Sequence, residues 1–197
     1  MTRRRVVLAV VALLVVVLVA LPFLRDREDR DVIAERDSHR QAGHSFVATD
    51  AGVLHYALTG PPEGELVVLI HGVSGPMTVW DHTEPALVAA GYRVLRFDHF
   101  GRGLSDRIEG PYDLALYVDS VTALLAALAP DARPHLVGSS MGAIVAAAWA
   151  QAQPERVRSV ALIGPAGFEL EATPAAKLMK VPYLSGYLMK VIGDGSL

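Results

Sequence analysis

Short apolar runs with strand-like composition alternate along the chain with longer amphipathic segments. The predicted strands are residues 66–70, 93–97, 135–137 and 160–163, and the predicted helices are residues 80–90, 114–129 and 140–153. Strands that alternate with helices favour a parallel sheet covered by helices on both faces. Upstream, residues 46–49 and 54–58 flank a turn signal, which predicts an antiparallel hairpin. We therefore predict an α/β fold with a doubly wound, mostly parallel sheet.

The first residues form the longest apolar run of the chain. Arg3, Arg4 and Arg5 precede an uncharged run over residues 6–24, which as a helix would be about 28 Å long and match a bilayer core. This pattern predicts an N-terminal transmembrane helix, a single-pass membrane anchor. A cleaved signal peptide is the alternative, but cleavage after Ala20 would place Leu18 where a small residue belongs. Arginines flank the run on both sides, so the side of the membrane on which the rest of the chain lies stays open.

Charge and composition divide the remaining chain. Residues 25–43 are a charged juxtamembrane linker, residues 44–168 carry the strand and helix pattern, and residues 169–197 mix lysines with apolar residues. This last segment reads as the start of a cap over the site or, alternatively, as a membrane-surface helix. The 18 Lys and Arg against 21 Asp and Glu give a net charge of −3 without a clustered basic face, so we expect no nucleic-acid partner. With no cysteine, a cysteine nucleophile and a thiolate metal site are excluded.

The strongest chemical signal lies between a predicted strand and a predicted helix. Gly138-Ser139-Ser140-Met141-Gly142 has the G-x-S-x-G pattern, in which a sharp turn lifts the central serine above the edge of a sheet. Gly138 and Gly142 suit this turn because side chains there would meet neighbouring backbone. Ser140 is therefore the candidate nucleophile, and a helix N-cap is its purely structural alternative.

Two further signals follow the predicted strands 66–70 and 93–97. An acyl-transfer site needs two backbone N–H donors for the developing oxyanion, and the Val73 and Met141 amides are the candidates. His71, before Gly72, is more readily explained as a side chain that fixes this loop than as a general base. Asp98 opens the turn from Asp98 to Ser105, which we interpret as scaffolding because Asp98 and His99 point apart.

These signals together resemble the α/β-hydrolase superfamily over residues 44–168. The His-Gly loop, the D-x-x-G-x-G-x-S turn and the G-x-S-x-G pattern occur in the order typical of that family. The chain is similar to serine esterases, membrane-bound monoacylglycerol lipases and carbon–carbon bond hydrolases, and differs from branches with Asp at the nucleophile position. The resemblance implies Ser140 as nucleophile, Val73 and Met141 as oxyanion donors, and His71, Gly72, Asp98, Gly138 and Gly142 as structural support. It implies no cofactor and no metal.

The family places its acid and its histidine after the nucleophile. All histidines here precede Ser140, and the acids after it are Glu155, Glu169, Glu171 and Asp194, of which Glu169 matches the family position only poorly. The general base and acid are thus not found in this chain. We expect them beyond residue 197, together with the last strands of an incomplete sheet.

These motifs and the apolar N-terminal run together predict a membrane-anchored serine hydrolase. It would cleave carboxylic esters, with lipid or acyl esters favoured, and its partners would be the lipid bilayer and a small acyl or ester substrate. Two alternatives stay open. One is a non-catalytic, membrane-tethered binding protein, and the other is a carbon–carbon bond hydrolase or acyltransferase on the same fold.

Overall fold

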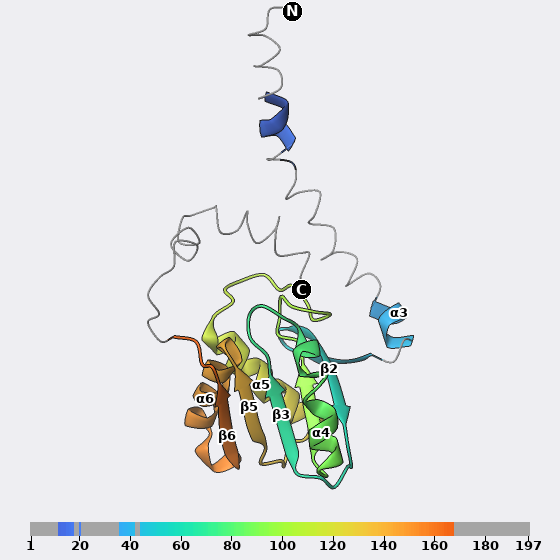
Figure 1. Ribbon diagram of the computed structural model, residues 1–197, viewed down its shortest axis with the longest axis vertical. Coiled ribbons are helices and arrows are strands. Elements are labelled where there is room, and N and C mark those ends of the chain that lie inside the picture. Colours follow the sequence, from blue (N-terminus) through green and yellow to red (C-terminus); the bar gives the residue numbers. More distant parts are fainter. Residues whose placement is uncertain (1–11, 18–19, 21–35, 42–43, 168–197) are drawn as a thin grey trace, which may run out of the picture. The chain divides into compact units, whose positions relative to one another are not determined.

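The computed structural model describes residues 12–17, 20, 36–41 and 44–167. The chain divides into two units, one of residues 1–34 and 169–197 and the other of residues 35–168. Figure 1 shows the sheet and helices of the second unit. Within the described ranges, no helix has the length and apolar character needed to cross a bilayer. The predicted anchor over residues 6–24 lies mostly outside those ranges, as does the predicted cap over residues 169–197, and both stay predictions.

A six-stranded sheet forms the centre of the second unit, in the order β1-β2-β4-β3-β5-β6. Strands β3 to β6 run parallel, and β1 and β2 form an antiparallel hairpin whose second strand pairs with β4. The mostly parallel α/β sheet predicted from the sequence is therefore confirmed. The strands are β1 (Ser45–Thr49), β2 (Gly52–Thr59), β3 (Leu66–Ile70), β4 (Arg93–Phe97), β5 (His135–Ser139) and β6 (Ser159–Ile163).

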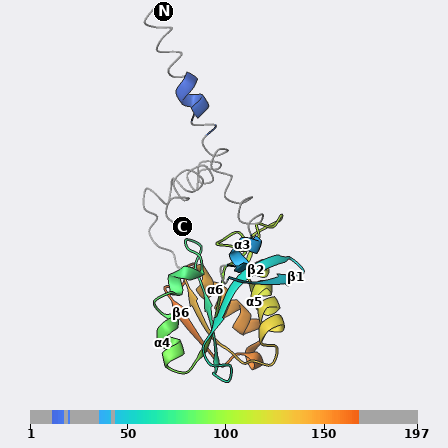
Figure 2. The same ribbon diagram turned by 90° about the vertical axis from the view of Figure 1, so that its right-hand side faces the viewer.

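Helices cover both faces of the sheet and bury two apolar clusters. On one face, α5 (Leu114–Leu128) and α6 (Met141–Ala152) pack on Leu66, Val68 and Ile70 of β3. On the other face, α4 (Glu84–Ala89) and η1 (Met77–Trp80) lie over Val67 and Leu69. Figure 2 shows α4 and α5 on opposite sides of the sheet. Strand β3 is buried throughout because its alternate side chains enter different clusters.

The remaining helical turns are short. The helix α3 (Arg36–Gln41) precedes β1, and the 3-10 turn η2 (Pro154–Arg156) leads from α6 into β6. Strand β6 ends the described sheet, with β5 as its one neighbour there and its side chains exposed.

One predicted helix is wrong in its extent. The pattern predicted a helix over residues 80–90, whereas the structure has the 3-10 turn η1 up to Trp80 and then α4 from Glu84. Pro85 explains the difference, because its ring lacks an N–H and clashes with the preceding turn inside a helix. In the first turn of a helix proline is well tolerated, so α4 begins next to it.

Trp149 joins the two helices on one face of the sheet and provides a test of the packing. Its side chain is fully buried, and its indole N–H donates to Thr122 Oγ1 of α5 at 3.0 Å. We expect Trp149→Ala to lower the free energy of unfolding by about 3–5 kcal/mol, because it removes the largest side chain of the cluster and leaves a cavity. Urea unfolding measures this loss, and Gln151→Ala on the exposed side of α6 is the matched control. A loss no larger than that of the control would contradict the packing described here.

Candidate active site

Ser140 occupies a strained turn between β5 and α6. Its backbone has φ 54° and ψ −116°, and it is the one residue other than glycine with positive φ in the described ranges. Such a conformation costs about 1–3 kcal/mol and persists only where surrounding contacts enforce it. The contacts are very close: a Cβ on Gly138 would lie 2.2 Å from the Gly142 carbonyl oxygen, and one on Gly142 would lie 2.2 Å from that of Ile70. The turn therefore needs glycine at both positions.

Backbone hydrogen bonds tie Ser140 to the segment that ends with β6 and follows it. The Ser140 N–H donates to the Ile163 carbonyl at 3.0 Å, and the Ala166 N–H donates to the Ser140 carbonyl at 3.2 Å. The side chain remains partly exposed at the carboxyl end of the parallel strands, where ligands bind in sheets of this kind.

The loop after β3 lies directly beside the Ser140 side chain. A Cβ built on Gly72 would stand 3.0 Å from Ser140 Cβ and 3.6 Å from Ser140 Oγ. A side chain at position 72 would thus fill the space next to the hydroxyl. The glycine lets the backbone of the loop, rather than a side chain, face the nucleophile candidate.

His71 holds the first peptide of this loop, and its neighbours fix its tautomer. The His99 backbone N–H donates to His71 Nε2 at 2.9 Å, so that nitrogen carries no proton. His71 Nδ1 then carries the proton and donates to the Gly72 carbonyl at 2.6 Å. Carbonyl and N–H point in opposite directions across a trans peptide. The Val73 N–H therefore points away from the His71 ring.

Arg102 holds the next peptide of the loop. Its Nε donates to the Val73 carbonyl at 2.8 Å, and its Nη1 donates to the Gly101 carbonyl at 2.9 Å. The N–H groups of Val73 and Met141, the two predicted oxyanion donors, have no acceptor within the described part of the chain. Met141 is the first residue of α6, where amide N–H groups lack partners in the helix and the helix dipole favours negative charge.

Asp98 lies in a buried network rather than beside Ser140. Its carboxylate accepts from His55 Nδ1 at 2.6 Å, from the Met77 N–H at 2.7 Å and from the Leu104 N–H at 3.0 Å. Burial acts to raise the pKa of Asp98, but these three hydrogen bonds outweigh it and hold the pKa below its usual value. The structure thus places the Asp98 charge among groups that brace loops.

His99 is buried without a charge partner. Its Nε2 donates to the His71 carbonyl at 3.1 Å, and its Nδ1 has no hydrogen-bond partner. Burial, with the positive charges near it, lowers the pKa of His99 to about 3. The pKa of His71 is also lowered, chiefly by burial. Both rings are neutral near pH 7, and neither forms a hydrogen bond with Ser140.

The described residues place no base at the serine. No histidine nitrogen or carboxylate forms a hydrogen bond with Ser140 Oγ in this part of the chain. Within the same ranges, no three ligating side chains are arranged to hold a metal ion. The site as described therefore comprises a serine on a strained turn and two amide donors, held by buried polar side chains.

Sequence reasoning missed two contributors to this arrangement. His55 was assigned only to a strand, and Arg102 only to a turn. Their partners are Asp98 and Val73, which are distant in sequence, and no local pattern links them. The pairing of β2 with β4, in which Tyr56 lies opposite Phe97, is what brings His55 next to Asp98.

The family described as the alpha/beta hydrolase fold matches residues 65–188, well over half of the chain. The chain belongs to this family. A protein of Variovorax paradoxus provisionally named carbamate hydrolase RutD is 37% identical over 111 residues, which are 56% of this chain and 41% of that protein. The 2-hydroxy-6-oxononadienedioate/2-hydroxy-6-oxononatrienedioate hydrolase of Paraburkholderia xenovorans is 37% identical over 141 residues, which are 66% of this chain and 47% of that protein.

A solved structure also resembles the chain. The crystal structure of a membrane phospholipase A matches with a TM-score of 0.62 and 27% identity, over 98% of this chain and 70% of that one. The chain spans less than half the length of the two curated relatives. Since the three names refer to different substrates, membership of the family supports a hydrolase-type enzyme without selecting the reaction.

The two hydrogen bonds of His71 can be separated by substitution in this hydrolase-fold chain. His71→Leu leaves the Gly72 carbonyl and the His99 N–H unpaired, and we expect a loss of about 1–3 kcal/mol of unfolding free energy for each buried group. In His71→Asn the amide nitrogen stands about where Nδ1 stood, so the bond to Gly72 is restored and the loss is smaller. Urea unfolding measures both variants, and equal losses would contradict the donor role of Nδ1.

Burial of neutral His99 makes stability depend on pH. Because its pKa is about 3 in the folded protein and near 6.5 when unfolded, the unfolded chain binds the proton more tightly over this interval. The contribution of neutral His99 to the free energy of unfolding is therefore fully present above about pH 6.5. It decreases as the pH falls towards 3. We expect His99→Gln, whose amide can still donate to the His71 carbonyl, to reduce this slope by up to about 1.4 kcal/mol per pH unit. Unfolding curves of both proteins at successive pH values provide the measurement. The same pH dependence in wild type and His99→Gln would refute the role of His99 in it.

Proposed function

We propose that this chain is the nucleophile-bearing part of a serine hydrolase that cleaves carboxylic esters. The observation that carries the proposal is the strained Ser140 turn, with the backbone at Gly72 close beside its hydroxyl. A helix N-cap needs neither the positive φ nor the close loop, so the purely structural alternative leaves both unexplained. Strain of this kind at a partly exposed serine supports a role in chemistry.

In the proposed reaction, Ser140 Oγ attacks the ester carbonyl carbon and its proton passes to a general base. The Val73 and Met141 N–H groups donate to the oxyanion that forms, His71 and Arg102 having fixed the peptides around Val73. Collapse of this intermediate releases the alcohol, which takes up the proton, and leaves an acyl group on Ser140. Water then attacks the acyl group and releases the acid. We propose that the base is a histidine beyond these residues, oriented by an acid.

Two observations support lipid or acyl esters at a membrane as the substrates. The uncharged run over residues 6–24 is long enough for a single-pass anchor. We therefore propose that the chain is located at a membrane. The solved structure that matches 98% of this chain bears the name membrane phospholipase A. A membrane-anchored enzyme would meet amphiphilic esters at the bilayer surface, with the segment over residues 169–197 as a cap.

One observation favours a second candidate, a binding protein without catalysis. No histidine base reaches Ser140 in the described ranges, and a serine without its base retains only the rate supplied by the oxyanion donors and substrate binding. Carbon–carbon bond hydrolysis and acyl transfer would use the same turn and donors, so substrate comparison must separate these reactions.

Labelling with a fluorophosphonate probe tests the nucleophile. We expect the full-length protein in native membranes to be labelled covalently and Ser140→Ala to be unlabelled, because the probe forms its bond with an activated serine. Ser139→Ala is the matched control, since it removes the neighbouring hydroxyl from the same turn and should remain labelled.

Hydrolysis of short-chain and long-chain esters by the same preparations should follow the labelling. Equal rates for the full-length protein and Ser140→Ala would reject Ser140 as nucleophile. An abundant, folded full-length protein that takes no label would favour the binding protein.

A further inference from the structure

Arg102, like Arg133 and Arg156, is an arginine of the described residues that bonds to neutral oxygens and not to a carboxylate. Two neutral carbonyls, those of Val73 and Gly101, hold its guanidinium through Nε and Nη1. In the described part of the chain no carboxylate pairs with it, and Nη2 has no acceptor. By contrast, Arg36, Arg96 and Arg158 each pair with a carboxylate. Arg102 is thus a positioned but unbalanced positive charge.

The charge of Arg102 acts on the groups around the candidate site. Its guanidinium helps to lower the pKa of both His71 and His99, after burial, and it opposes the rise that burial causes in the pKa of Tyr117. The carbonyl that it holds belongs to the residue after Gly72, whose backbone lies against Ser140. An anion bound to Arg102 would therefore lie next to the loop that faces Ser140.

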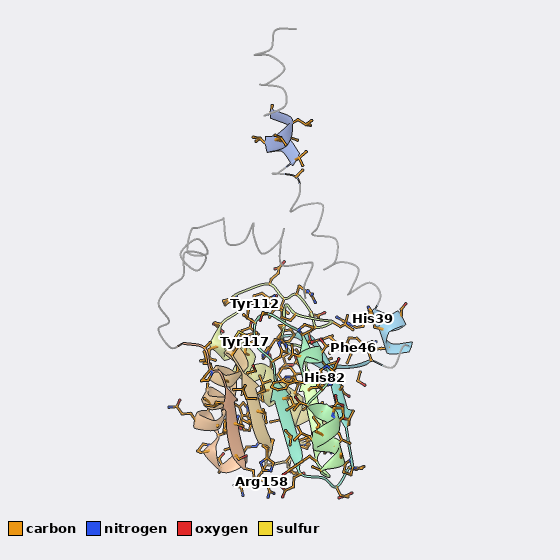
Figure 3. All side chains as sticks on the ribbon, viewed as in Figure 1. His39, Phe46, His82, Tyr112, Tyr117 and Arg158 are labelled. Atoms are coloured by element: carbon orange, nitrogen blue, oxygen red, sulfur yellow. The ribbon has the colours of Figure 1, made fainter. Side chains whose placement is uncertain are left out.

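Two exposed apolar side chains belong to the segments around Arg102. Val73 is 44% exposed and Tyr112 is 41% exposed. The Tyr112 ring lies so close to Gly101 that a Cβ on the glycine would stand 2.7 Å from Tyr112 Cε1. Figure 3 shows Tyr112 beside Tyr117 at the end of the sheet where the site lies. We call Val73, Arg102 and Tyr112 the Arg102 rim, a surface that combines one positive charge with two exposed apolar side chains.

We propose that Arg102 binds the anionic head group of an amphiphilic ester substrate, with a phosphate as the group it takes. The proposal rests on the proposed function and narrows its substrate class to esters that carry both an apolar chain and a negative charge. A guanidinium suits this task because it remains charged and its N–H groups match the geometry of phosphate oxygens. The neighbouring apolar side chains would contact the part of the ester next to the charged group.

Binding of ether analogues tests this role independently of catalysis. The probes are 1-alkylglycerol 3-phosphate and the uncharged 1-alkylglycerol with the same chain, both used below their micelle-forming concentrations. Neither probe contains a carboxylic ester that the proposed reaction could cleave. Calorimetry on the full-length protein in detergent should give tighter binding of the phosphate. We expect Arg102→Gln to weaken phosphate binding by about tenfold or more and the uncharged probe by less than about twofold.

Two further variants separate charge from loop bracing. Arg102→Lys keeps the charge and should retain part of the preference for phosphate, a preference that added salt weakens. Arg133→Gln, which removes an exposed arginine bonded to the Val157 carbonyl, is the matched control and should change neither affinity. A carboxylate-bearing ether of the same length shows whether any anion suffices, and its binding as tightly as the phosphate would overturn the assignment of phosphate.

The remaining outcomes are distinct. Equal weakening of both probes in Arg102→Gln would overturn the proposal and leave Arg102 as a brace of the loop. Should Arg102→Gln fail to fold, the salt dependence of wild type and Arg102→Lys decides, and binding without salt dependence overturns the proposal. Charge-dependent binding in a protein that takes no fluorophosphonate label would retain the anion site while rejecting the proposed function.

Discussion

The buried carboxylate of Asp98 is the constraint on which the loops around Ser140 depend. A carboxylate removed from water must be fully hydrogen-bonded, and the three donors to Asp98 come from three separate segments. Met77 belongs to the segment after β3, Leu104 to the turn that carries Arg102, and His55 to the hairpin. Because one carboxylate joins all three, displacement of any segment removes one of the hydrogen bonds that stabilise this buried charge. The candidate site therefore acquires its shape from a residue that does not touch the serine.

The histidines near the site act by remaining neutral. His71 must accept from the His99 N–H while it donates to Gly72, and only the tautomer with its proton on Nδ1 does both. His99 in turn donates to the His71 carbonyl, so the ends of β3 and β4 are joined by two reciprocal bonds. Side chains committed in this way are poor carriers of a proton during a reaction. His71 and His99 consequently hold the loops in place and are not suited to transfer a proton.

Local patterns predicted the order of strands and helices because apolar runs and glycine turns report directly on the backbone. They also predicted the Ser140 turn, since glycine at 138 has a steric cause within a few residues, whereas glycine at 142 is required by the distant backbone of Ile70. They wrongly predicted a helix over residues 80–83, because Pro85 is tolerated only in the first turn and α4 therefore begins at Glu84. They also failed for His55 and Arg102, whose partners are brought close only by strand pairing and by the path of distant loops. A polar side chain whose partner is far along the chain has no periodicity to reveal it.

The hydrogen bonds of Ser140 to Ile163 and Ala166 have a consequence for biosynthesis. A ribosome delivers Gly138 to Gly142 before it delivers β6, so the nascent chain contains the serine before it contains the backbone groups that hold it. Positive φ at Ser140 is costly without those partners, and the turn can relax until β6 pairs with β5. The order of synthesis thus places formation of the Ser140 turn after docking of a later strand. On this argument the strained conformation of Ser140 would become stable only once β6 is in place.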